Sequence, residues 1–265
     1  MNYVGKSIHH RLSGKIVNWL VGDSQEIYNH NLKHHYDLLE SNGWLNRTID
    51  YSFNRHGFRS EEFSSDDSIV FLGASDTLGV GLPIEYTWCH IVAQELKLKM
   101  FNLGQGGSSG CTAFRLASYW IPILKPKVVI LMSPLNPRIE LISDSLLSDI
   151  NTEHKRSYYQ MGPHVLDTRS YFWSYISDHS VKKELQSFYH AWSSSELNLT
   201  LMQQKNSLAI SMLAQQSGSK FILACSEKDW KGTHGTDYSR DLQHCGMKGN
   251  QIVAELILDR VSKEC

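Results

Sequence analysis

Four short apolar runs, separated by helix-like segments, most constrain how this chain can fold. The runs are Ile69–Leu72, Met100–Leu103, Val128–Met132 and Phe221–Ala224. None of them alternates with polar residues, so they predict strands that are buried on both faces of a sheet. Apolar strands that alternate with helices are typical of parallel βα units. We therefore expect an α/β fold, a three-layer α/β/α sandwich with a mostly parallel sheet.

The helical periodicity of the remaining segments suggests how the chain is divided. The expected helices of the main domain are Thr87–Leu98, Cys111–Leu124, Leu197–Gln216 and Gly249–Val261. Residues 1–67 are polar and rich in His and Asn, and one further helix is expected at about Asp23–Ser41. We expect residues 1–67 to form a partly helical lead-in segment and residues 68–265 to form the main domain.

The main domain contains a stretch longer than a simple crossover needs, which predicts an insertion at about residues 141–200. Its aromatic residues are Tyr158, Tyr159, Tyr171, Phe172, Trp173, Tyr175, Phe188, Tyr189 and Trp192. Such rings either form a small core of their own or line a binding cleft with flat apolar faces. The sequence leaves both alternatives open.

The composition argues against several classes of protein. With 26 Lys+Arg against 27 Asp+Glu and a net charge of −1, the chain has no general attraction for nucleic acid or anionic lipid. No apolar run approaches the roughly 18 residues that span a bilayer, and the amino terminus lacks the apolar region of a signal peptide. We expect no nucleic-acid partner, no membrane span, and a cytoplasmic or virion-associated protein.

The residues that commonly bind metals are poorly arranged for it. The five cysteines are scattered and never form a C-x-x-C pair, which favours reduced thiols over a zinc site. Two pairs of adjacent histidines, at 9–10 and 34–35, do not face the same way on a helix, and no carboxylate is placed to join them. We expect no metal ion.

A dinucleotide site is the main cofactor alternative, because Gly104-Gln105-Gly106 follows an expected strand. However, Ser109 stands at the third small position, and no Asp or Glu occurs between 105 and 139 to bind a ribose hydroxyl. We expect no organic cofactor.

Ser75 is a candidate nucleophile. It follows the first apolar run behind Gly73 and Ala74, small residues that allow a tight turn and leave the hydroxyl exposed. In open α/β sheets the ligands bind at the carboxyl ends of the strands, which is where Ser75 is expected. The alternative is a serine that only hydrogen-bonds its own turn.

Asp241 and His244 have the spacing of a catalytic acid and base. They are three residues apart, on a loop that leads into the last expected helix. A carboxylate in this position can orient an imidazole, whose second nitrogen then takes a proton from a serine.

Gly107 and Asn136 are candidates for an oxyanion hole. Each follows an expected strand at the same edge of the sheet as Ser75. A glycine amide can approach a substrate closely, and an asparagine carboxamide donates without carrying charge. Taken singly, either residue is also a common turn residue.

Four segments in this order resemble the motifs of the SGNH (GDSL-type) hydrolases. They are Gly73-Ala74-Ser75, Asn102-Leu103-Gly104-Gln105-Gly106-Gly107, Ser133-Pro134-Leu135-Asn136 and Asp241-Leu242-Gln243-His244, and the resemblance spans about 69–261. It implies the flavodoxin-like fold of that family, with the triad Ser75, His244 and Asp241. It also implies an oxyanion hole made of the Ser75 amide, Gly107 and Asn136. The segment 51–59 resembles the one that precedes this domain in some members.

The resemblance implies a carboxylic ester hydrolase, an acyl- or acetylesterase that works through an acyl-enzyme without a cofactor. Its expected partners are small-molecule or glycan esters, with acylated carbohydrates and lipid esters as the candidate substrates. The sequence identifies neither the acyl group nor the oligomeric state.

Two positions depart from the family pattern, and they motivate an alternative of a different class. Ala74 replaces the usual Asp, and Ser133 replaces the usual Gly. The alternative is a catalytically silent SGNH-like domain that acts as a binding or structural module. Just after the third motif, Arg138 and Glu140 are spaced for an ion pair at the sheet edge, or for contact with a substrate.

Overall fold

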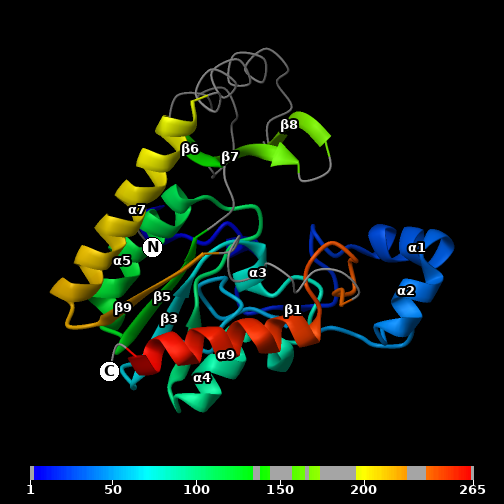
Figure 1. The fold of residues 1–265 in the computed structure, drawn as a ribbon, viewed down its shortest axis with the longest axis horizontal. Helices are drawn as coiled ribbons and strands as arrows, with labels where there is room; N and C mark the ends of the chain where they lie inside the picture. Colours follow the sequence, from blue (N-terminus) through cyan, green and yellow to red (C-terminus); the bar gives the residue numbers. More distant parts are fainter. Residues whose placement is uncertain are drawn as a thin grey trace.

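A parallel sheet lies between two layers of helices in the computed structural model (Figure 1). The structure describes residues 3–133, 138–143, 157–164, 167–173, 195–225 and 237–263. The sheet contains β3 (Ser68–Leu72), β4 (Lys99–Asn102), β5 (Val128–Ser133) and β9 (Lys220–Cys225) in the order β4-β3-β5-β9, and every pairing is parallel. All four expected strands are therefore confirmed to within a residue or two.

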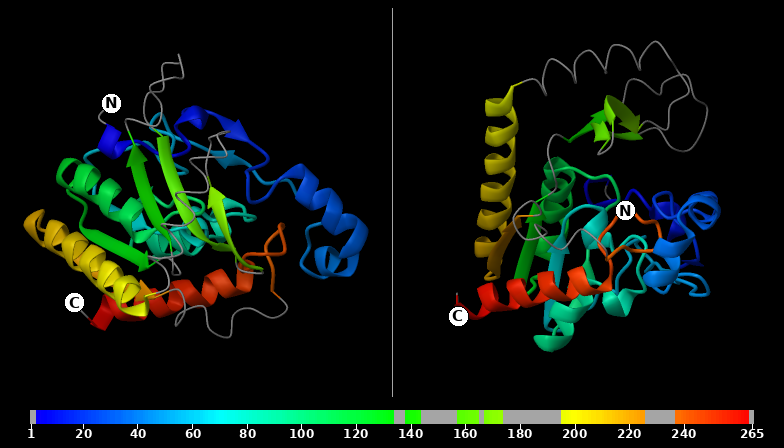
Figure 2. Two further views of the ribbon diagram at one scale, coloured as in Figure 1. Left: turned by 90° about the horizontal axis from the view of Figure 1, so that it is seen from above. Right: turned by 45° about the vertical axis from the view of Figure 1, so that its right-hand side comes forward.

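Two helices cover each face of this sheet. Helices α4 (Trp88–Glu95) and α9 (Met247–Lys263) pack on one face, and α5 (Gly110–Leu124) and α7 (Glu196–Gln216) cover the other (Figures 1 and 2). The expected three-layer α/β/α sandwich is confirmed.

Burial on both faces explains why the strands are continuously apolar. Every residue of β3 and β5 is buried. Ile69 and Phe71 belong to the core under α4 and α9, whereas Val70 and Leu72 belong to the core under α5 and α7. Successive side chains of a strand point to opposite faces, so each strand supplies both cores at once.

Side-chain caps define where the main helices begin. Thr87 accepts a hydrogen bond from the His90 amide at the start of α4, and Ser195 accepts one from Asn198 at the start of α7. Ser109 and Thr112 form a reciprocal capping box at the start of α5. Each cap satisfies amides that have no partner within the helix.

The lead-in segment forms a third core against the turn that follows β3. It contains α1 (Gln25–His34), α2 (Tyr36–Ser41), β1 (Ile16–Val17), β2 (Tyr51–Ser52) and 3-10 helices at Tyr3–Gly5 and His10–Leu12. The single helix expected at Asp23–Ser41 is wrong, because His35 leaves helical geometry at φ −140° and divides it into two. Buried residues of the segment, such as Trp44 and Tyr51, pack with Leu78 and Val80.

Three antiparallel strands follow β5 in the chain. They are β6 (Ile139–Ser143), β7 (Ser157–His164) and β8 (Asp167–Trp173), in the order β6-β7-β8. Of the aromatic residues predicted for the insertion, Tyr158, Tyr159, Tyr171, Phe172 and Trp173 lie on β7 and β8. The remaining four lie outside the described residues.

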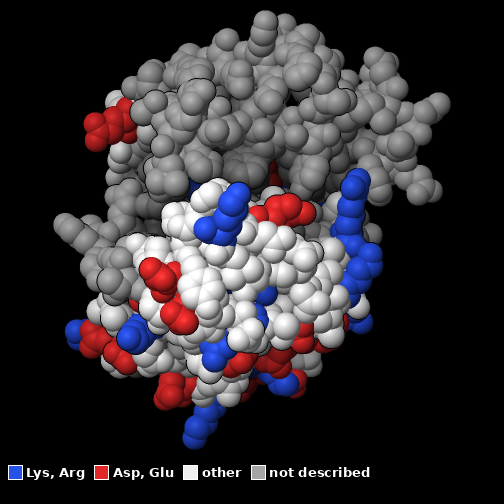
Figure 3. All heavy atoms as spheres, turned by 90° about the vertical axis from the view of Figure 1, so that its right-hand side faces the viewer, with Lys and Arg blue, Asp and Glu red and all other residues white. Residues whose placement is uncertain are grey.

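The described part of the chain contains no helix that is both long and apolar enough to cross a bilayer. On the face shown in Figure 3, acidic and basic side chains lie interspersed, in keeping with a net charge of −1.

The sheet provides a matched test of how much burial contributes to stability. Leu131 of β5 and Leu223 of β9 are neighbours in the register, but Leu131 is 2% exposed and Leu223 is 47% exposed. Leu131→Ala should lower the free energy of unfolding by about 2–5 kcal/mol, because it leaves a cavity in the core. Leu223→Ala should lower it by less than about 1 kcal/mol. Urea unfolding measures both, and equal losses would contradict the packing described above.

Candidate active site

Ser75 begins the short helix α3 (Ser75–Leu78), directly after β3 and the Gly73-Ala74 turn. Its side chain is half-buried. As the first residue of the helix it has an amide with no partner inside the helix. Among the described residues, neither this amide nor the hydroxyl makes a hydrogen bond. Both groups of Ser75 can therefore bind a ligand.

Gly73 allows the turn before Ser75 to pack against α3. A Cβ atom at Gly73 would lie 2.0 Å from Thr77 Oγ1 and 3.0 Å from the carbonyl oxygen of Met132. Real Cβ atoms do not approach other atoms so closely, so a larger residue would displace the turn. The glycine of the first motif thus has a steric explanation of its own.

The loop after β4 is anchored to α3 by Asn102. Asn102 Nδ2 donates to the carbonyl oxygen of Thr77 at 2.6 Å, and its Oδ1 accepts from the Gly104 amide at 2.8 Å. The Gln105 amide and the Ser108 hydroxyl both donate to the carbonyl oxygen of Gly73, at 3.1 and 3.0 Å. These contacts bring the second motif against the first.

Gly107 lies on the same loop with its backbone open to a ligand. Its φ is +69°, in the left-handed region that favours glycine, and no heavy atom lies within 4 Å of where a Cβ would be. Within the described residues its amide donates no hydrogen bond. The amides of Gly107 and Ser75 are thus two donors without partners on loops that touch each other.

Asp241 and His244 form a hydrogen-bonded pair. His244 Nδ1 and Asp241 Oδ2 are 2.5 Å apart, while Asp241 Oδ1 accepts from Ser239 Oγ and from the amides of Gln243 and His244. Leu242 adopts a φ of +57°, and the loop there folds back around the carboxylate. Because Nδ1 is engaged, Nε2 is the nitrogen that remains to take a proton from a nucleophile.

The pair shifts both pKa values in the direction that keeps it charged. Burial acts to lower the pKa of His244, but the charge and hydrogen bond of Asp241 outweigh it and raise the pKa to about 9. Burial acts to raise the pKa of Asp241, but the charge of His244 and the bonds to its carboxylate hold that pKa below its usual value. The His244 side chain is 20% exposed, so solvent screens the pair only in part.

His244 lies within electrostatic range of the turn that carries Ser75. Asp76, the next residue along, raises the pKa of His244, and Arg138 lowers it. The amide of Arg240, next to Asp241, donates to the carbonyl oxygen of Gly81 at 3.0 Å, which joins the two loops directly. No hydrogen bond joins Ser75 to His244 among the described residues. Hydrogen bonds between catalytic residues are often longer before a substrate binds, so Ser75 and His244 remain candidates for proton transfer.

Asn136 lies outside the described residues. The ion pair expected between Arg138 and Glu140 is wrong, because Glu140 is buried against Arg115, whose Nε and Nη2 bind the carboxylate at 2.8 and 3.0 Å. Arg138 Nη1 instead donates to the carbonyl oxygen of Ser108, at 3.4 Å.

Sequence reasoning missed a buried network below the site that joins Asp23, Tyr51 and Arg59 of the lead-in segment to Arg240. Arg240 and Asp23 are 217 positions apart, and neither belongs to a recognisable spacing pattern. No signal in a single sequence could have paired them.

No three His, Cys, Asp or Glu side chains converge to hold a metal ion within the part of the chain that the structure describes.

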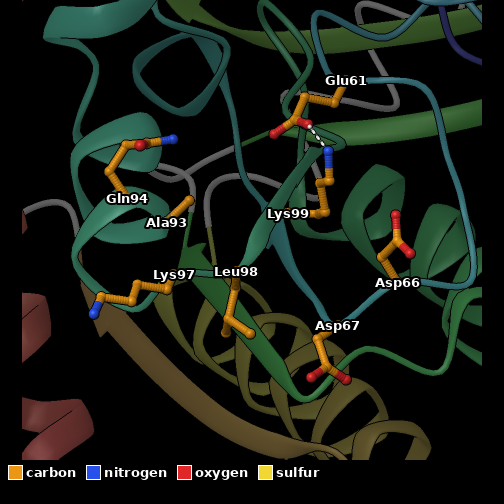
Figure 4. A pocket seen from close by; sticks show the side chains of 8 residues that line it. All are labelled: Glu61, Asp66, Asp67, Ala93, Gln94, Lys97, Leu98 and Lys99. Carbon is orange, nitrogen blue, oxygen red and sulfur yellow. Dashed lines mark hydrogen bonds and ion pairs between the residues drawn. The ribbon is translucent and has the colours of Figure 1, made fainter.

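A hollow of about 480 Å³ lies at the opposite end of the sheet from Ser75, where β4 begins and the chain enters β3 (Figure 4). Charged side chains line much of it, and Lys99 pairs there with Glu61 at 3.1 Å. This hollow is separate from the Ser75 site.

No protein-family model matches the sequence, and no curated protein is similar to it. Similar solved structures include the esterase EstA from Pseudoalteromonas sp., at 11% identity and a TM-score of 0.38, covering 75% of this chain and 98% of that one. The acetyl xylan esterase Est2A from the rumen bacterium Butyrivibrio proteoclasticus is 12% identical, with a TM-score of 0.40, and the match covers 82% of this chain and 67% of that one. A member of the lipolytic protein G-D-S-L family from Veillonella parvula is 15% identical, with a TM-score of 0.33, and the match covers 72% of this chain and 96% of that one.

The Asp241–His244 pair predicts an unusual titration. In the wild-type protein the imidazole of His244 should titrate near pH 9, because the adjacent carboxylate stabilises its charged form. In Asp241→Asn the pKa should fall by at least about 2 units, since burial remains and the attracting charge is gone. Histidine resonances followed by NMR against pH measure both values. An unchanged midpoint in Asp241→Asn would show that the pair does not form in solution.

Proposed function

We propose that this chain is a serine ester hydrolase of the SGNH type. The observation that carries the proposal is the His244 imidazole, held by Asp241 on a loop bonded to the turn that follows Ser75. Acyl transfer needs a serine whose hydroxyl and amide are free and an imidazole that is oriented to take the serine's proton. Residues 68–265 would form the catalytic domain, with the stretch at about 141–200 as an insertion.

The reaction would proceed in two halves. Ser75 Oγ attacks the carbonyl carbon of the ester and gives its proton to His244 Nε2. The ester C–O bond then breaks, and the alcohol leaves with that proton, so that an acyl-Ser75 remains. A water molecule attacks the acyl carbon and gives a proton to His244, which returns it to Ser75 as the acid is released.

The amides of Ser75 and Gly107 would stabilise the oxyanion that forms in each half. Neither donates elsewhere within the described residues, and both belong to loops held together through Gly73 and Asn102. The Asn136 carboxamide would be the third donor. Fixed donors aimed at a developing charge typically contribute several kcal/mol to catalysis.

The substrate class would be carboxylic esters of small molecules or glycans. The aromatic insertion favours acylated carbohydrates or lipid esters, because flat apolar rings bind sugar faces and acyl chains. The second candidate function is a silent SGNH-like module, which Ala74 in place of the family's Asp motivates.

A fluorophosphonate probe separates these two functions. The wild-type protein should be labelled on one serine and should hydrolyse acetyl, butyryl or longer esters, or acetylated glycans. Ser75→Ala should lose labelling and at least about 10³-fold of turnover. Because only neutral His244 can act as the base, kcat/KM should rise with pH up to about 9. A wild-type protein that is folded yet neither labels nor turns over would support the silent module.

The oxyanion assignment makes a prediction for Asn136. Asn136→Ala should lower kcat roughly 100- to 1,000-fold with little change in KM, because the lost bond forms mainly in the transition state. Steady-state kinetics on the best ester of the panel measures both parameters. A rise in KM at constant kcat would instead make Asn136 a group that binds the ground state of the substrate.

A further inference from the structure

A tyrosine of the lead-in segment lies directly beneath the turn that follows Ser75. Tyr51, on β2, is fully buried. Its hydroxyl donates to Asp23 Oδ2 at 2.5 Å and accepts from the Gly81 amide at 2.8 Å. The group therefore joins the lead-in segment to a residue only three positions beyond the end of α3.

Gly81 and Arg240 complete a closed ring of hydrogen bonds. The Gly81 carbonyl oxygen accepts from the Arg240 amide at 3.0 Å, and the Arg240 side chain returns to Asp23. Arg240 Nη2 lies 2.6 Å from Asp23 Oδ2, and its Nε lies 3.1 Å from each carboxylate oxygen. The turn that follows Ser75 and the loop that carries Asp241 and His244 are thus held together both directly and through Tyr51 and Asp23.

The two loops also touch too closely to move independently. Gly81 has a φ of +76°, and a Cβ there would lie 2.6 Å from Ser239 Oγ. Ser239 Oγ in turn donates to Asp241 Oδ1. A displacement of Gly81 would therefore shift Ser239, and with it the Asp241 carboxylate that orients His244.

Arg59 fixes the end of α3 from the same side. Its Nη1 donates to the carbonyl oxygens of Leu78 and Gly79, at 3.2 and 2.5 Å, and Nη2 donates to that of Leu82 at 2.7 Å. The guanidinium lies over the Tyr51 ring, 4.4 Å from its centroid. The ring of Tyr51 thus supports Arg59, while its hydroxyl supports Gly81.

We propose that the Tyr51 hydroxyl, held by the Asp23 carboxylate that Arg240 also binds, is a positioning group that sets the place of Ser75 relative to Asp241 and His244. This inference rests on the proposed function of those three residues. Proton transfer between serine and imidazole needs the two atoms within about 3 Å, and a misplacement of about 1 Å can cost 100-fold in rate. On this view the lead-in segment contributes to the site through Asp23 and Tyr51.

Tyr51→Phe tests the proposal, since it removes the hydroxyl and keeps the ring. In the folded variant we expect kcat to fall at least about tenfold while KM stays within about twofold, because substrate contacts are untouched. The rate of fluorophosphonate labelling should fall by a similar factor. Should Tyr51→Phe not fold, Arg240→Lys, which keeps the charge opposite Asp23 but loses the forked contact, is measured in the same way.

Tyr28→Phe is the matched control. Tyr28 packs against the same core, and its hydroxyl donates to the carbonyl oxygens of Trp44 and Leu45, at 3.0 and 2.9 Å. Tyr28→Phe should lower the melting temperature, as Tyr51→Phe does, but should leave kcat and the labelling rate unchanged. If both variants lose stability alike and both keep the wild-type kcat, the hydroxyl of Tyr51 is structural and the proposal is overturned.

A measurement that needs no activity separates this proposal from the proposed function. Asp241, Asp76 and Arg138 are the charged groups that act on His244, and none is altered in either variant. If the ring of hydrogen bonds positions the loop, Tyr51→Phe should move the NMR titration midpoint of His244 by about 0.5 units or more, and Tyr28→Phe should not. An unchanged midpoint in Tyr51→Phe would refute positioning even in a protein with no esterase activity, and a shifted midpoint would support it there.

Discussion

The buried ion pair between Asp23 and Arg240 is the interaction on which the site depends. Both side chains are almost completely removed from water, so each charge would be costly without the other. The surroundings offset this cost with directed contacts, because Tyr51 donates to the carboxylate, the Asn18 carbonyl oxygen accepts from the guanidinium, and the Trp19 ring lies 3.9 Å from it. An apolar pair could fill the same space, but it would leave the Tyr51 hydroxyl without its acceptor and would remove the contact that holds the Arg240 side chain to the lead-in segment.

The helix that carries Ser75 is held in place by its neighbours. Four residues are too few to form a stable helix alone, since one turn fixes several dihedral angles for a single hydrogen bond. Asn102 of β4 donates to the carbonyl oxygen of Thr77, and Arg59 of the lead-in segment donates to that of Leu78. Gly104 permits this crowding, because a Cβ there would lie 2.6 Å from the Leu78 amide nitrogen. The position of Ser75 is therefore a property of the whole fold.

The sequence predicts the sheet and its helices well because each depends on a local pattern of apolar residues. The runs that become β3 and β5 are recognisable without any partner, and the triad candidates stand on motifs of three to six residues. The lead-in segment was harder to predict. Its two short helices are separated by a single non-helical residue, His35, which breaks no apolar periodicity. Its contacts with the site join side chains that only the folded chain brings together, such as Tyr51 with Gly81.

The separation of Asp23 from Arg240 along the chain also governs when the site can form. The ion pair joins positions 217 residues apart, and Asn31 and Trp44 likewise bind the loop that precedes α9. During synthesis the lead-in segment emerges before the main domain, and Arg240 follows Asp23 only 217 residues later. Contacts between such distant residues form slowly, because a long loop must close before they contribute. The last part of the fold to assemble should thus be the junction beneath Ser75, and a chain truncated before Tyr238 would leave Asp23, Asn31 and Trp44 without these partners.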